Sequence, residues 1–229
     1  MSARDEIFAG LRRSLHVTGH EAPRRAAVAA RLRGSPRGVV PARGQGGLPT
    51  FQAEALRAGA TLATVASAAE VPDEIARYLR DSNLPATLRM GADARFAAMP
   101  WAATTLEITR GASDGHDLNA VSAAFAAVAE TGTLALVSGP DNPTTLNMLP
   151  DNHIVVLFAE DVVGDFETVF DRLRARYGAE MPRTLNFITG PSRSADIEQT
   201  LLFGAHGPRR LHIVLAGVER SSIGGGDAR

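Results

Sequence analysis

The chain contains no cysteine, and this absence excludes several kinds of site at once. Disulfide bonds cannot form, and no thiolate is available to hold zinc or an iron–sulfur cluster. No apolar run approaches the roughly 18 residues that a membrane span requires, and the N-terminus lacks the apolar segment of a secretory signal. We therefore expect a cytoplasmic chain with no redox cofactor of its own.

The chain also lacks an excess of charge of either sign. Its 24 lysines and arginines oppose 25 aspartates and glutamates, a formal net charge of −1, so no basic field attracts nucleic acid. Arginines concentrate between Arg12 and Arg43, and Glu21 interrupts this segment. A targeting segment would avoid acidic residues, which favours a basic arm that contacts a partner protein.

The chain has 229 residues, 45% of them hydrophobic, which suffices for one domain with a sizeable core and an extension. Residues 1–48 are predicted to form a helical N-terminal extension and linker, because a narrow apolar stripe over residues 7–15 precedes a second, arginine-rich helix at residues 23–32 and a glycine-rich stretch. Residues 49–218 are predicted to form one α/β domain, and residues 219–229 a disordered tail.

Short apolar runs alternate with helical patterns from residue 49 onward, which is typical of βαβ units. The run Ile154–Phe158 is apolar throughout, as a strand covered by helices on both faces requires. The sequence therefore predicts an α/β fold with a mainly parallel sheet, helices on both faces, and ligand sites beyond the carboxyl ends of the strands. The predicted strands are residues 61–65, 86–90, 104–109, 133–137, 153–158, 184–189 and 211–215, and the predicted helices are residues 72–80, 118–129, 166–177 and 195–202.

Glu130 is the candidate catalytic residue. It follows the predicted helix 118–129, where a carboxylate meets the negative end of the helix dipole at a cost on the order of 0.3 to 1 kcal/mol. One interpretation makes Glu130 a nucleophile, a base or a ligand-orienting carboxylate, with hydroxyls from Thr131 and Thr133 and a close backbone approach at Gly132. The alternative is a solvated glutamate before a helix stop.

A long polar connection, residues 138–153, joins two predicted strands, and connections of this length are often functional. Asn142, Thr144 and Asn147 are candidates for neutral hydrogen bonds to a small carboxylate or sugar, and His153 enters the next strand beside them. The alternative is ordinary turn chemistry, which also favours proline and asparagine.

A third candidate loop follows the strand at residues 184–189. Gly190, Ser192 and Arg193 precede a predicted helix, whose first amides form a possible site for a phosphate or carboxylate. Asp196 already complements the helix dipole there, which favours a capped structural helix instead. His206 lies in a Gly-Pro-containing loop that reaches the same rim. The histidines and Glu130 show no metal-ligand spacing, so no metal site is predicted.

The sequence resembles the LutC-type branch of the lactate-utilisation (LUD) domain family in four segments, found in the family's order. They are distributed over most of residues 100–216: Ala129–Thr133, Asn147–Ile154, Ile188–Glu198 and Gly204–His212.

This resemblance implies a sheet similar to the NagB/RpiA/CoA transferase-like fold. It also implies a role in carbon metabolism, as one part of a three-part system that oxidises L-lactate to pyruvate, in which iron–sulfur and cysteine-rich partner proteins handle the electrons. One departure stands out: many relatives carry a glycine- and arginine-containing segment where this chain has Pro140–Thr145. If that arginine clamps a carboxylate, Arg193 or Arg209 would have to replace it here.

Three functions stay open. The first is a partner subunit needed for lactate oxidation, whose polar rim binds a small carboxylate or phosphate or a neighbouring subunit. The second is an enzyme of the coenzyme A transferase or sugar phosphate isomerase kind that uses Glu130, a reading by fold analogy. The third is a structural scaffold.

Overall fold

The computed structural model describes residues 2–34, 37–194 and 202–218. By its internal contacts the chain divides into two units, Met1–Val39 and Val40–Arg229. The tail predicted to be disordered, residues 219–229, and residues 195–201 of the predicted helix 195–202 lie outside the described residues; Leu202 belongs to a strand.

The first unit contains two helices, α1 (Ala3–Leu15) and α2 (Ala22–Gly34), at positions where the sequence predicts helices. A capping box begins α1: the Ser2 side chain accepts a hydrogen bond from the Asp5 amide, and Asp5 accepts one from the Ser2 amide. Neither helix buries a residue, so the apolar stripe of α1 stays exposed.

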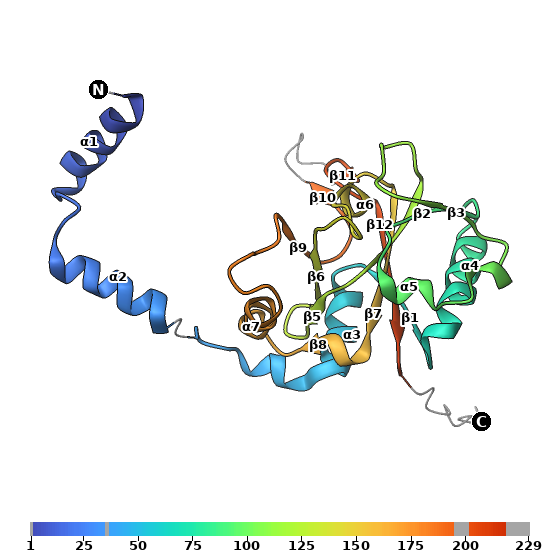
Figure 1. The fold of residues 1–229 in the computed structure, drawn as a ribbon. Coiled ribbons are helices and arrows are strands. Elements are labelled where there is room, and N and C mark those ends of the chain that lie inside the picture. The colour runs from blue at the N-terminus through green and yellow to red at the C-terminus, as the bar shows by residue number, and fades with distance from the viewer. Residues whose placement is uncertain (1, 35–36, 195–201, 219–229) are drawn as a thin grey trace. The chain divides into compact units, whose positions relative to one another are not determined.

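The second unit is an α/β domain with helices and two main sheets (Figure 1). Its helices are α3 (Gly47–Arg57), α4 (Val71–Asp81), α5 (Ala94–Ala97), α6 (Thr145–Met148) and α7 (Phe166–Tyr177), with 3-10 turns at Ala42–Gly46, Ala68–Glu70, Trp101–Ala103 and Ala159–Asp161. Its strands are β1 (Thr61–Val65), β2 (Thr87–Met90), β3 (Glu107–Arg110), β4 (Asn119–Ala123), β5 (Ala126–Val128), β6 (Thr133–Val137), β7 (Asn152–Phe158), β8 (Val162–Val163), β9 (Leu185–Ile188), β10 (Arg193–Ser194), β11 (Leu202–Phe203) and β12 (Arg210–Ala216).

The larger sheet has six strands in the order β1-β12-β7-β4-β2-β3, and every neighbouring pair is parallel. Successive residues of β7 enter different cores. Ile154 and Val156 pack in the core that contains α4, whereas Val155 and Leu157 pack in the core that contains Phe51 of α3. Burial on both faces explains the continuous apolar run, so the prediction of a parallel sheet inside an α/β fold is confirmed.

The smaller sheet has four strands in the order β8-β5-β6-β9, with antiparallel pairs β5–β6 and β6–β9. The prediction of a helix over residues 118–129 is wrong, because this segment forms β4 in the larger sheet and β5 in the smaller one. Every residue of both strands is buried. Its alanines favour a helix locally, but burial between two sheets overrides that preference, and small side chains suit the close packing.

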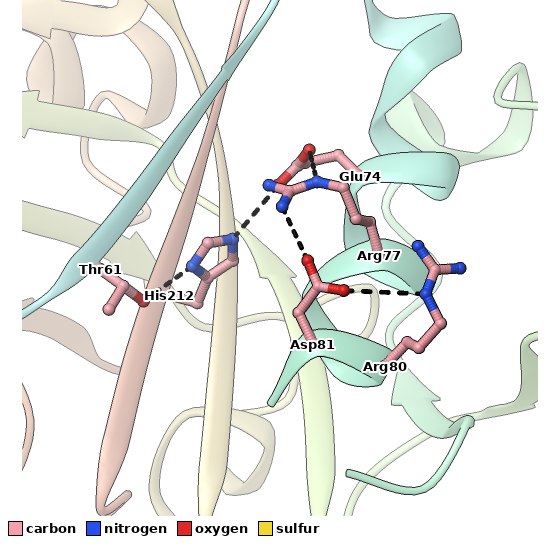
Figure 2. A network of polar contacts seen from close by, with 6 residues as sticks. All are labelled: Thr61, Glu74, Arg77, Arg80, Asp81 and His212. Atoms are coloured by element: carbon pink, nitrogen blue, oxygen red, sulfur yellow. Dashed lines mark hydrogen bonds and ion pairs between the residues drawn. The ribbon is translucent and has the colours of Figure 1, made fainter. Parts of the chain in front are cut away.

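A polar network joins α4 to the parallel sheet (Figure 2). His212, on β12, has its Nδ1 atom 2.8 Å from the Thr61 hydroxyl, and its ring stacks on Tyr78 with centroids 3.8 Å apart. The Glu74 carboxylate lies 4.0 Å from His212 Nε2 but is already bound by the Arg77 guanidinium. Burial, helped by the Arg77 charge, lowers the pKa of His212 to about 4.

Within the described residues, no helix combines the length and the apolar character that crossing a membrane demands.

The neutral state of His212 predicts a pH-dependent stability. Below pH 6.5 the imidazole of His212 is protonated in the unfolded chain but stays neutral in the folded protein. The free energy of unfolding therefore falls by up to about 1.4 kcal/mol per pH unit until the pH reaches about 4. Urea unfolding at pH 7 and pH 5 measures this loss. His212→Phe, which retains an aromatic ring for Tyr78, should lose roughly 2 kcal/mol less than the wild type over that interval.

The matched control is His116→Phe, because His116 is exposed. It should keep the wild-type pH dependence. An unchanged dependence in His212→Phe would contradict the role assigned to this histidine.

Candidate functional site

A cavity of about 210 Å³ lies at the amino ends of β7 and β12, and α6, β9 and two loops complete its wall. The expectation that the polar residues gather beyond the carboxyl ends of the strands is therefore wrong for this group. The loops around residues 147 and 206 precede β7 and β12 rather than follow them, so they meet at the opposite edge of the sheet. The lining residues are Asn147, Met148, His153, Phe187, Ile188, Thr189, Gly190, Pro191, Ser192, His206, Gly207, Pro208 and Leu211.

Three buried polar side chains form a network beside this cavity. The Ser122 hydroxyl, from β4, donates a hydrogen bond of 2.8 Å to Asn147 Oδ1 and lies 3.1 Å from His153 Nε2. All three residues are at most 1% exposed. Strand pairing brings the two residues close, because Ser122 on β4 lies opposite Val155 on β7, two positions after His153.

Two polar atoms of this network have no hydrogen-bond partner among the described residues. Ser122 has a single hydrogen and gives it to Asn147, so its oxygen accepts from His153 Nε2–H. Asn147 Nδ2 and His153 Nδ1 then have no partner among the described residues. Turning the carboxamide of Asn147 by half a turn exchanges the roles, but one donor and one acceptor are still left unpaired.

His153 is uncharged at neutral pH. Complete burial lowers its pKa to about 3, since removal from water penalises the imidazolium form. No carboxylate pairs with it among the described residues, and its neighbour Ser122 is neutral. The network is therefore a set of neutral hydrogen-bonding groups.

The predicted residues Thr131 and Thr133 reach the cavity through a chain of hydroxyls. Thr131 Oγ1 lies 2.7 Å from Thr133 Oγ1, which lies 2.7 Å from Thr189 Oγ1 at the cavity wall. Thr133 and Thr189 are neighbours because β6 pairs with β9. Thr131 and Thr133 thus support the wall without being among the residues that line it.

Glu130 lies in the turn between β5 and β6, so the argument from a helix dipole does not apply to it. Its amide donates to the carbonyl of Gly164 at 3.2 Å, and it is not one of the cavity-lining residues. Its Oε2 atom is buried and has no hydrogen-bond partner in the part of the chain that the structure describes. A catalytic role for Glu130 stays a prediction.

Gly132, in the same turn, has φ +68°, and a Cβ atom there would lie 2.3 Å from the amide nitrogen of Ala55 on α3. The predicted close backbone approach therefore involves α3. Gly190 has φ +78° and approaches the carbonyl of Ala58 in the same way.

Two loop segments hold the remaining cavity wall in place. The Ser192 amide donates to the Pro208 carbonyl at 2.8 Å, which joins the loop after β9 to the loop that carries His206. The Arg193 guanidinium donates to the Ala58 carbonyl. His206 is exposed at the rim, and the predicted residue Asp196 lies outside the described residues.

Asn142 and Thr144 do not line this cavity. The Asn142 side chain donates to the Val137 carbonyl at 3.0 Å and so fastens the loop that precedes α6. Thr144 precedes α6 without a side-chain cap bond.

A second, charged cavity of about 720 Å³ lies beyond the carboxyl ends of β4 and β7, and Asn142 lines it. Arg95 lines this cavity. Its guanidinium binds Asp93 and the Ala124 carbonyl, and it lies 3.6 Å from the Asp161 carboxylate. Burial raises the pKa of Asp161, although Arg95 and Arg172 oppose the shift. Sequence reasoning missed this cluster because its members follow three different strands and form no motif.

No group of three or more histidine, aspartate or glutamate side chains within the described ranges is arranged to hold a metal ion.

The part of the chain that contains the smaller cavity is similar to known proteins. Residues 119–216 match the LUD domain, and all of the residues that line the smaller cavity fall inside this range. "Lactate utilization protein C" of Exiguobacterium sp. is 34% identical over 117 residues, which cover 50% of each chain. "Lactate utilization protein C" of Bacillus subtilis is 36% identical over 90 residues, 38% of each chain. The matches span half or less of the length of these relatives.

A solved structure, that of a DUF162 family protein from Deinococcus radiodurans, is similar over 77% of this chain and 100% of the other. The two have a TM-score of 0.58 and 25% sequence identity, which supports the same α/β fold.

Removal of the central hydroxyl should destabilise the domain. Ser122→Ala leaves both Asn147 and His153 buried without their shared partner, so we expect a loss of about 1–3 kcal/mol in the free energy of unfolding. Denaturant titration of both proteins measures the difference. Ser67→Ala, at an exposed serine, should change stability by less than about 0.5 kcal/mol. A cost for Ser122→Ala no larger than that of the control would refute the network.

The turn at Gly132 should not tolerate a side chain. Gly132→Ala combines an unfavourable φ with a clash against the α3 backbone, so a destabilisation of more than about 1 kcal/mol is expected in thermal or urea unfolding. Gly139→Ala serves as the comparison, because open space surrounds that position and its φ is ordinary. Equal stability of the two variants would show that α3 does not constrain the turn.

Proposed function

We propose that the chain is a component of an L-lactate utilisation system in the cytoplasm, because residues 119–216 match the LUD domain and similar proteins are called lactate utilization protein C. In this proposal L-lactate is oxidised to pyruvate by the assembled system. Iron–sulfur and cysteine-rich partner proteins carry the electrons, since this chain has no cysteine with which to hold a cluster through thiolates.

The observation that carries the proposal is the position of the smaller cavity. Three of the four segments that resemble the LUD family contribute to its wall, and the fourth reaches it through the hydroxyl of Thr133. Segments far apart in the chain thus meet at one mostly apolar hollow with a few polar lining residues, which is the usual form of a small-molecule site. We assign ligand binding to Asn147 and His153.

Catalysis by Glu130 is not needed for this role. Glu130 is separate from the residues that line the cavity. The network around Ser122 consists of neutral groups that bind and orient, and none of its members is an activated nucleophile or a base poised near neutral pH.

The proposal predicts a growth phenotype. Deletion of this chain should abolish growth on L-lactate and leave growth on pyruvate intact, because only the oxidation step is lost. The wild-type chain and Glu130→Gln should restore growth, whereas His153→Phe should not. Growth curves on the two carbon sources, with immunoblots to confirm equal protein levels, measure these outcomes. Normal growth of the deletion strain on L-lactate would refute the proposed function.

A further inference from the structure

We infer that the edge of the larger sheet at β1 binds an extended segment of a partner protein that carries basic side chains, and that this segment adds to the sheet as a further strand. The inference concerns an interaction surface outside the matched residues 119–216, and it does not rest on the proposed function.

The first observation is that β1 forms a sheet edge without protection inside the strand. Among the described strands β1 pairs only with β12, and no backbone hydrogen bond between described residues joins residues 61–64 to any other segment. Edge strands are commonly guarded by charged residues, prolines or bulges. The sequence of β1 is Thr-Leu-Ala-Thr-Val and its register with β12 is uninterrupted, so it has none of these guards.

The opposite edge of the same sheet provides the contrast. β3 pairs only with β2 among the described strands, and it begins and ends with exposed charged residues, Glu107 and Arg110. Such charges hinder pairing with another chain. Of the two edges, β1 is therefore the one suited to accept a further strand.

The second observation is a cavity of about 590 Å³ that touches residues 62–65 of β1. Successive residues of a strand point to opposite faces of a sheet, so a cavity that reaches four residues in a row runs along the edge rather than over one face. The other wall of this cavity is formed by the beginning of α4. An extended segment can then pair with the strand through its backbone while alternate side chains enter the cavity.

The third observation is the charge of the α4 wall. Its residues are Glu70, Asp73, Glu74 and Arg77. Their spacing of three, four and seven residues places them on one helix face. Three carboxylates oppose one guanidinium, which Glu74 and Asp81 already bind. The amino end of the helix adds roughly half a positive charge, which leaves this wall negative.

This negative wall determines which kind of segment fits. Asp73 is exposed, and none of the ion pairs between described residues includes it. Lysine or arginine at every second position of an added strand would lie on the α4 side and offset this charge. A second copy of the chain fits less well. Antiparallel pairing of β1 with its own copy would place both α4 walls on the same face, where their negative charges repel.

A synthetic peptide, acetyl-Val-Lys-Val-Lys-Val-Lys-Val-amide, tests the inference, because its lysines lie on one side when it is extended. Titrated into the isotope-labelled full chain, it should bind with a dissociation constant below about 1 mM. NMR should show shifts of the amide signals of residues 61–65 and their slower hydrogen exchange. The same peptide with glutamate in place of lysine should bind at least about tenfold more weakly.

Methylation of the peptide backbone tests strand addition itself. A strand pairs with a given neighbour through every second residue. One peptide is therefore N-methylated at all valines and another at all lysines, and only one of the two should lose binding. Contact through side chains alone would give no such alternation.

Variants of the chain test the charge. Asp73→Lys should weaken binding of the lysine peptide at least about tenfold, and Asp73→Asn should weaken it less. Glu107→Lys, at the other edge of the sheet, makes the same change of charge and should leave binding unchanged. Circular dichroism melting checks that each variant is folded.

Absence of shifts at β1 with the lysine peptide at millimolar concentration, or equal binding of the glutamate peptide, would overturn the inference. A dimer in sedimentation whose β1 amides are protected without peptide would also overturn it, because a second copy would then occupy the edge. None of these results affects the growth test on L-lactate, so the proposed function stands or falls separately.

Discussion

Complete burial of strand β4 is the constraint on which the rest of this domain depends. The strand lies between β2 and β7, all five of its residues are buried, and one of them is Ser122. A hydroxyl at such a position requires hydrogen-bond partners inside the protein, because water is excluded. Asn147 and His153 are those partners. Their presence brings α6 against β4 and leaves two buried polar atoms, Asn147 Nδ2 and His153 Nδ1, without a partner among the described residues.

The smaller cavity and the charged cavity lie at opposite ends of the strands of the parallel sheet. The smaller one, at the amino ends of β7 and β12, is mostly apolar and uncharged, whereas the larger one, beyond the carboxyl ends of β4 and β7, is crossed by the Arg95–Asp93 and Arg95–Asp161 ion pairs. Parallel α/β sheets usually bind ligands at the carboxyl edge. Here the loops that carry Asn147 and His206 lie at the amino ends instead, because they precede β7 and β12.

The described lining of the smaller cavity bears on the proposed role in lactate utilisation. Since none of the described residues that line it is a lysine or an arginine, this cavity is poorly suited to hold the lactate anion, and the loop that would carry a clamping arginine has Pro140–Thr145 instead. In the proposed role, the chain therefore fits a subunit that supports its partners better than one that binds the lactate anion itself. The neutrality of His153 agrees with this, because a buried imidazole without a carboxylate neither attracts an anion nor exchanges a proton near neutral pH.

Several properties followed from the sequence alone. Continuous apolar runs such as Ile154–Phe158 specify strands buried on both faces and hence a parallel sheet, and the lack of cysteine rules out thiolate-held clusters, since both are local or compositional facts. The loops that contain Asn147, His153, Ser192 and His206 were also recognisable as polar breaks in that pattern. Tertiary structure decided how these loops come together.

It also decided that residues 119–123 and 126–128 form strands, that Glu130 is not one of the cavity-lining residues, and that Ser122 joins Asn147 and His153. The physical reason is that an alanine-rich segment suits either conformation until its neighbours are known. Likewise, the role of the Ser122 hydroxyl cannot be predicted from the sequence, because its partners are known only once β4 is paired with β7.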